Sequence, residues 1–261
     1  GRPQVNARVE SGMQLPTKQP KFLNAYQTAT LVNEGYTNDG LAPQFTQEDL
    51  DLFQSHADPY GHPDVNWYEV VLKDYSLQTN SNIDISGGTE AVKYFISVGA
   101  FNQNGNLRKF SDPRNQGVNN QYFFHRYNFR SNLDIQATKN LKLRLDVRGN
   151  FGQINEPVFY PALSGVGVSG IIQEIYDFHI ITPYAAPVLN PNGTYAYAYG
   201  PNLSNNPTIN SRLSTMGYNR TSRTDYNVLF GFTERLDYIT KGLSLEGKIA
   251  YASTSDIIRV L

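Results

Sequence analysis

The chain has 261 residues, with 22 Lys and Arg against 23 Asp and Glu, a formal net charge of −1 and no cysteine. The charge balance argues against a nucleic-acid partner, and without cysteine there is no disulfide, thiolate metal site or cysteine nucleophile. Only 17% of the residues are charged, yet the mean hydropathy is −0.46, so uncharged groups such as the 26 Asn supply the polarity. The 18 Tyr and 14 Phe are too many for a disordered segment.

Neither end of the sequence has the features of a natural terminus. The chain starts at Gly1 without an initiator Met or an apolar leader, and it ends directly after an apolar stretch. No run of 18 apolar residues is present, so we expect no transmembrane helix. We therefore expect residues 1–261 to be a piece of a longer protein.

Alternation with a period of two is the main pattern along the chain. It is clearest in 141–151, where Leu, Val and Phe fall on one face and Lys, Arg, Asp and Asn on the other. A strand separates two such sets and a helix mixes them. The same pattern predicts about seven strands, over 5–13, 77–86, 92–102, 123–136, 141–151, 223–233 and 243–252.

The connections between these strands alternate in length. Those over 87–90, 137–140 and 239–242 are short, whereas those over 14–76, 103–121 and 156–221 are long. Short turns at one end and long loops at the other are typical of a transmembrane β-barrel. A soluble sandwich also has alternating strands, but it has no reason to sort its loops by end. We therefore predict an all-β fold, the antiparallel portion of such a barrel.

Each face of the predicted strands has its own chemistry. The apolar face carries little charge, which suits lipid, with His125 and Glu234 as exceptions that we expect near an interface. Aromatic girdle candidates are Tyr94, Phe123, Tyr127, Phe151, Tyr226, Tyr238 and Tyr251. The polar candidates for lining a lumen are Arg126, Arg130, Arg144, Arg148, Asp134 and Asp146. They could bind substrate or another domain, or only neutralise one another across strands. With its apolar residues facing lipid, the chain is expected to have no core of its own.

The long loops are expected to carry short helices, over 24–35, from Thr46 as an N-cap, over 67–72 and over 169–180. Aromatic and amide side chains in these loops could stack on sugars and bond to them; the substrate-contact candidates are Trp67, Tyr195, Tyr197, Tyr199 and Asn202. The alternative is a loop packed on itself. Asp58, His62 and Asp64 cluster in a segment that we interpret as a polar, Pro-containing turn.

Several segments resemble one protein family as a set. They are 67–71 (WYEVV), 81–90 (SNIDISGGTE), 93–99 (KYFISVG), 126–134 (RYNFRSNLD) and 138–142 (TKNLK). Together they resemble the early barrel of the SusC/RagA family, the TonB-dependent transporters of the Bacteroidota outer membrane. One departure is Asn66, where the family often has an acidic residue before the Trp.

The resemblance implies both a fold and a function. It implies about seven strands of a larger barrel of the 22-stranded type, with residues 1–261 as its N-terminal part and with no plug domain in this chain. It further implies outer-membrane import of an oligosaccharide or peptide, a SusD-like surface lipoprotein as lid, TonB acting through the absent plug, and a surrounding membrane of lipid and lipopolysaccharide.

Other classes of function remain open on the residues alone. A soluble all-β glycan-binding module with Tyr- and Asn-rich loops would share the alternation, and so would an autonomous eight-stranded membrane barrel. An enzyme has the least support, because no residue pattern suggests a catalytic group, a cofactor site or a metal site.

Overall fold

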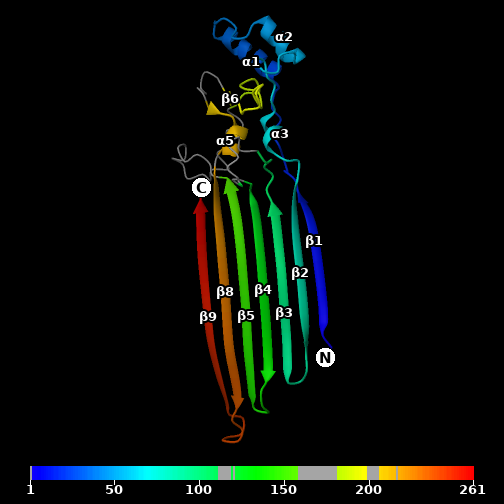
Figure 1. The fold of residues 1–261 in the computed structure, drawn as a ribbon, viewed down its shortest axis with the longest axis vertical. Helices are drawn as coiled ribbons and strands as arrows, with labels where there is room; N and C mark the ends of the chain where they lie inside the picture. Colours follow the sequence, from blue (N-terminus) through cyan, green and yellow to red (C-terminus); the bar gives the residue numbers. More distant parts are fainter. Residues whose placement is uncertain (1, 111–118, 120, 158–180, 199–205, 216) are drawn as a thin grey trace.

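A computed structural model describes residues 2–110, 119, 121–157, 181–198, 206–215 and 217–261 (Figure 1). Its main feature is a seven-stranded antiparallel sheet in the order β1-β2-β3-β4-β5-β8-β9, so each strand pairs with the one before it. The strands are β1 (Gln4–Gln14), β2 (Ser76–Gly88), β3 (Val92–Asn104), β4 (Phe123–Gln136), β5 (Leu141–Pro157), β8 (Tyr218–Arg235) and β9 (Ser244–Val260). All seven predicted strands are therefore confirmed.

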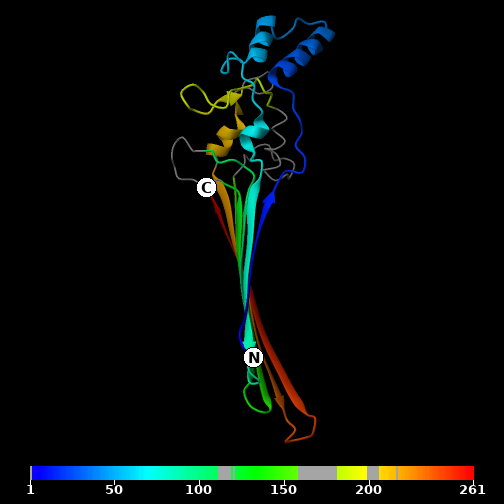
Figure 2. The same ribbon diagram turned by 90° about the vertical axis from the view of Figure 1, so that its right-hand side faces the viewer.

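The connections separate by length between the two ends of the sheet. The turns 89–91, 137–140 and 236–243 join strands at one end, drawn at the bottom of Figure 1, and the segments 15–75, 105–122 and 158–217 leave from the other. Edge-on, the sheet is a single twisted layer, with the helices gathered beyond the loop end (Figure 2). The predicted sorting of the connections is confirmed.

Three strands are longer than their apolar alternation predicts. β5 continues to Pro157, β8 begins at Tyr218 and β9 continues to Val260. In these extensions the ladder continues although the strict alternation of apolar and polar residues stops; across it, Gln153 Nε2 donates to Ser222 Oγ at 3.0 Å. Backbone pairing does not need an apolar face, so hydrophobic periodicity underestimates these ends.

The register places the two kinds of side chain on opposite faces. Leu145 lies opposite Leu133 and Phe230, whereas Asp146 lies opposite Asn132 and Leu229. We call the first side the apolar face and the second the polar face. The apolar face is uncovered in this chain, and Ile249 at its β9 edge is 74% exposed.

Aromatic rings form the border of the apolar face on the side of the long loops. We call Tyr127, Phe151, Tyr226 and Tyr251, on β4, β5, β8 and β9, the aromatic girdle. Ring centroids are 6.4 Å apart between Tyr127 and Phe151, and 5.8 Å apart between Tyr226 and Tyr251.

The other girdle candidates lie outside this group of four. Tyr94 lies toward the turn end, Tyr238 lies in the β8–β9 turn, and Phe123 lies four residues beyond Tyr127 on the loop side. The two exceptions to the apolar rule lie at the borders: His125 follows the girdle on β4, and Glu234 lies at the turn end of β8.

The buried apolar side chains lie in the loops. In the described residues, every buried Ala, Val, Leu, Ile and aromatic side chain lies outside the seven-stranded sheet. One cluster includes Trp67, Val71, Leu107 and Ile209, and a second joins Ala25 and Ala29 to Phe53. The expectation that the chain has no core is therefore wrong for the loops, although the sheet itself has none.

The loops contain four described helices: α1 (Ala25–Asn38), α2 (Gln47–Ser55), α3 (Trp67–Val71) and α5 (Ile209–Thr215). We call these helices with 15–24, 39–66 and 181–198 the loop head. The first three were predicted; α5 and the two-residue strands β6 (Tyr197–Ala198) and β7 (Asn206–Pro207) were not, and the predicted helix 169–180 lies outside the described residues. None of the described helices combines the length and the apolar character that crossing a membrane requires.

Candidate functional site

The polar face brings together the six residues expected to line a lumen. Arg126, Arg130 and Asp134 alternate along β4, and Arg144, Asp146 and Arg148 alternate along β5. Residues directly opposite in an antiparallel pair point to the same side. The register sets Asp134 opposite Arg144, and Arg130 opposite Arg148.

The shortest ion pair in this group runs along one strand. Arg144 Nε lies 2.8 Å from Asp146 Oδ2, two residues away on β5. Asn132 Nδ2 donates to the other oxygen of Asp146 at 2.5 Å, and Arg130 Nε donates to Asn132 Oδ1 at 2.8 Å. The link between the strands is therefore made by an amide, whereas the sequence suggested cross-strand neutralisation of opposite charges.

This arrangement leaves arginines in excess near the middle of the polar face. The guanidinium carbon of Arg126 lies 5.6 Å from the ring centroid of Phe101, and that of Arg130 lies 5.7 Å from Phe95. Arg148 lies between Arg130 and Asn227 in the register and has no ion pair within the described chain. Such a surface can bind anionic groups and hydrogen-bond acceptors.

Trp67 lies in the packed base of the loop head. Asn66 caps α3 by accepting the amide N–H of Tyr68 at 3.2 Å, and Trp67 is 3% exposed against Val71 and Leu107. Its indole Nε1 is buried and has no acceptor among the described residues. The ring is therefore closed to solvent in this structure, and its contact with a substrate stays a prediction.

A cavity of about 370 Å³ borders this tryptophan. The rings of Phe22 and Tyr68 stack along it, with centroids 5.1 Å apart and planes inclined by 25°. Asp64 and Thr28 add polar atoms to its wall. Aromatic planes beside acceptors and donors suit a sugar ring or a peptide side chain.

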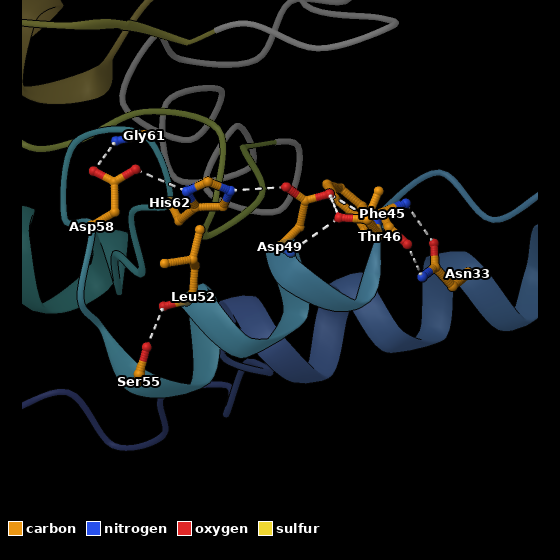
Figure 3. Close-up of polar contacts among 9 residues, drawn as sticks. All are labelled: Asn33, Phe45, Thr46, Asp49, Leu52, Ser55, Asp58, Gly61 and His62. Atoms are coloured by element: carbon orange, nitrogen blue, oxygen red, sulfur yellow. Dashed lines mark hydrogen bonds and ion pairs between the residues drawn. The ribbon is translucent and has the colours of Figure 1, made fainter.

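A histidine between two carboxylates fixes the outer part of the loop head (Figure 3). His62 Nε2 lies 3.0 Å from Asp49 Oδ1 in α2, and Nδ1 lies 2.9 Å from Asp58 Oδ2 in the adjoining turn. The imidazole also packs edge-on against Phe53, with centroids 5.1 Å apart. The segment interpreted as a polar turn is therefore tied to a helix by His62.

The electrostatics of this cluster favour a charged histidine. A neutral imidazole has one N–H, whereas both ring nitrogens here face carboxylate oxygens. The hydrogen bonds with Asp49 and Asp58 raise the pKa of His62. The pKa of Asp49 is lowered by hydrogen bonds from Thr46 and His62, and that of Asp58 by the Gly61 backbone N–H and by His62.

The remaining substrate-contact candidates lie on the β6 hairpin or outside the described residues. Tyr197 is 60% exposed and pairs with Pro207, and Tyr195 lies opposite Leu189 in an isolated bridge. Tyr199 and Asn202 fall in 199–205, outside the described residues. The structure thus separates Trp67, in a core, from Tyr197, on the surface.

No family model matches the chain. It is 27% identical over 194 residues to TonB-dependent receptor P26 of Formosa agariphila, and 23% identical over 202 residues to TonB-dependent receptor P3 of the same organism. Each match covers 74% of this chain but 16% and 18% of the respective relatives. The chain thus spans less than a fifth of the length of these relatives.

Solved structures of the RagAB peptide transporter are similar in fold to this chain. The RagAB peptide transporter matches with a TM-score of 0.61 at 16% identity, over 98% of this chain and 29% of that one. The RagAB peptide importer in its open-open state matches with the same score at 17% identity. These likenesses show the fold.

The curated relatives and the solved structures agree on one class of proteins to which this chain is similar, the TonB-dependent receptors and transporters. Within that class, the resemblance to the SusC/RagA type is confirmed: this chain is similar in sequence to TonB-dependent receptors and in fold to part of a RagAB transporter. Receptors and transporters, rather than enzymes, are the relatives at the level of the family.

The sequence did not indicate several contacts of the candidate site. The link from His62 to Asp49 joins residues 13 apart, and the Phe22–Tyr68 stack joins residues much farther apart. Thr46 was expected as an N-cap, and its capping box with Asp49 is present. The capping box could be expected from the sequence because it is a local pattern. Contacts between residues far apart in the chain leave no such pattern in the sequence.

Proposed function

We propose that this chain forms wall and surface loops of an outer-membrane barrel that imports a large nutrient with energy from TonB. The observation that supports it best is the two-faced antiparallel sheet with short turns at one end and long loops at the other. A face of exposed Leu, Ile, Val and Phe is unfavourable in water and favourable in lipid.

The seven strands would be part of a larger closed barrel. β1 and β9 each have one neighbour in the sheet, so each presents a row of backbone N–H and C=O groups at an open edge. Hydrocarbon cannot satisfy such groups, which is why membrane sheets close on themselves. Residues 1–261 would then be the N-terminal part of the barrel, with the plug and the remaining wall outside this segment.

The substrate and the lid follow from the family resemblance. A SusD-like surface lipoprotein would close the barrel over the loop head, and the substrate would be an oligosaccharide or a peptide. Trp67, Tyr195, Tyr197, Tyr199 and Asn202 would contact it outside, and the arginines of the polar face would line its path. The solved RagAB complex, a peptide transporter, supports a two-component importer.

The orientation can be tested in intact cells that express the full-length protein containing this segment. Residues 1–261 contain no cysteine, so once any cysteine outside this segment is replaced, single cysteines at Tyr60 in the loop head and Lys241 in a turn give site-specific labels. A membrane-impermeant maleimide should label Tyr60→Cys in intact cells and Lys241→Cys only after the outer membrane is permeabilised. Labelling of both sites in intact cells would contradict the proposed orientation.

A soluble glycan-binding module is the weaker alternative. It would need a layer covering the apolar face, and no described element packs on either face of the sheet (Figure 2).

A further inference from the structure

We propose that the outward side of β8 and β9 holds the phosphorylated headgroup of an outer-leaflet glycolipid, between Arg220 and Arg259. This site lies beyond the aromatic girdle, on the same side of the sheet as the apolar face. The inference rests on the proposed membrane placement but concerns a ligand that the transport function does not require.

The register brings the two arginines together. Arg220 lies directly opposite Asn155 on one side and Arg259 on the other. Phe123 also lies opposite Asn155, so all four side chains share one row of the outward side. Arg220 is six residues from Tyr226 of the girdle on the same strand, and an even separation keeps both on one face.

The guanidinium of Arg220 is held in place on one side. Its Nε donates to Asn155 Oδ1 at 2.9 Å, and its Cζ lies 4.5 Å from the ring centroid of Tyr218 and 5.7 Å from that of Phe123. Within the described residues, no acceptor contacts its two Nη nitrogens. A planar donor pair is therefore pre-oriented for an external oxyanion.

The amide that holds this arginine is itself fixed. Asn155 is fully buried, and its Nδ2 donates to the backbone oxygens of Gln121 at 2.7 Å and Asn119 at 3.1 Å. Its carbonyl oxygen is thereby aimed at Arg220. The position of the arginine is part of the fold rather than that of a free surface side chain.

The local excess of positive charge favours the binding of an anion. Like charges directly opposite each other on neighbouring strands are destabilising, and Arg220 and Arg259 form such a pair. On the loop side of the girdle, the outward positions of the described strands carry amides, hydroxyls, apolar groups and His125, but no carboxylate. A phosphate that accepts hydrogen bonds from both arginines would offset this repulsion.

The distance of the two arginines from the aromatic girdle fits the position of a lipid headgroup. Asn155, opposite Arg220, is four residues beyond Phe151 of the girdle. Four residues of strand, tilted as in membrane barrels, rise on the order of 10 Å. That places the arginines in the polar layer next to the hydrocarbon, within reach of phosphates that lie above acyl chains.

The test uses the full-length protein in phosphatidylcholine nanodiscs with lipid A that carries both phosphates or with dephosphorylated lipid A. Native mass spectrometry should show bound lipid A in preference to its dephosphorylated form. The Arg220→Gln, Arg259→Gln double variant should bind phosphorylated lipid A about tenfold more weakly. The matched control is Arg223→Gln, an arginine of the same strand on the polar face, which should bind it like the wild type.

Equal binding of the two lipids by the wild type would overturn the site without relying on any variant. Equal affinity in the double variant, or full displacement by millimolar inorganic phosphate, would also overturn it, the latter pointing to a free-phosphate site. A protein that inserts but shows no phosphate preference contradicts this inference alone. A protein that does not insert contradicts the proposed membrane placement and this inference with it.

Discussion

At the scale of single residues, Trp67 combines a packing role with an unused donor. Its ring is buried among the apolar side chains of the loop head, while its Nε1–H has no acceptor in the described chain. Burying a donor without an acceptor lowers the stability of the fold, so the contribution of the N–H should be tested separately from that of the ring.

Two substitutions separate these roles. Trp67→Ala should lower the local stability of the loop head by about 3–5 kcal/mol because it opens a cavity. Trp67→Phe keeps a six-membered aromatic ring and removes the N–H with the rest of the five-membered ring, so its cost should be clearly smaller. Hydrogen exchange of α3 and α5 in the full-length protein measures both. If Trp67→Phe is as destabilising as Trp67→Ala, the N–H has an important structural partner and the account of its donor is wrong.

The His62 cluster predicts a pH dependence of the loop head. The pKa of His62 is raised in the fold, so its stabilisation is complete below the ordinary value of 6.5 and is lost as pH rises through the raised pKa. The pKa values of Asp49 and Asp58 are lowered, so their contribution is complete above 3.8 and is lost as pH falls.

Protection of 57–62 against hydrogen exchange, corrected for intrinsic rates, should therefore be greatest between the two ordinary values and should decline toward alkaline pH. In His62→Gln the alkaline decline should disappear. His56→Gln is the control, because His56 lies 3.8 Å from Asp64 and does not contact Asp49 or Asp58. An unchanged alkaline decline in His62→Gln would rule out His62 as its origin.

At the scale of the strands, the two faces of β5 and β8 should respond oppositely to charge. Leu145 lies on the apolar face opposite Leu133 and Phe230, and Leu229 lies on the polar face opposite Asp146. Leu145→Arg should destabilise the barrel by about 2–4 kcal/mol if it lies near the membrane midplane.

The matched substitution Leu229→Arg should cost less, because it places the same charge on the face that meets water. Urea unfolding of the full-length barrel in detergent, followed by heat-modifiable migration, compares the two. Equal destabilisation by both substitutions would mean that the two faces are not in different environments.

The strands were predictable from the sequence because their signal is local. Alternation over 141–151 or 123–136 is a property of neighbouring residues, and short turns set the pairing of β2 with β3, β4 with β5 and β8 with β9. The polar extensions of β5 and β8 were missed because pairing continues there without an apolar face. Helix α5 was missed because its seven residues have little periodicity.

The candidate site was predictable only in part. The six charged residues share one face of the sheet, since an even spacing fixes the side of a strand, and their place in a lumen stays a prediction. Their contacts were not, because the Asp146–Asn132 link depends on register between strands. The placement of Trp67 in a core depended on packing with α5, which is 142 residues away at Ile209.

At the scale of the whole molecule, the described sheet has no core of its own and two open edges, while the loop head has compact cores. Such a sheet is stable only where lipid covers the apolar face and further strands cover the edges. The central claim is therefore that the two faces of one strand meet different media, lipid on one side and water on the other.

Spin labels on β5 of the full-length protein in liposomes test this claim most directly. Single cysteines replace Leu145 and Val147 on the apolar face, and Lys142 and Arg148 on the polar face. The account predicts that labels at 145 and 147 collide with oxygen, which dissolves in lipid. Labels at 142 and 148 should instead favour a water-soluble nickel complex. Equal access of the nickel complex to all four positions would contradict it.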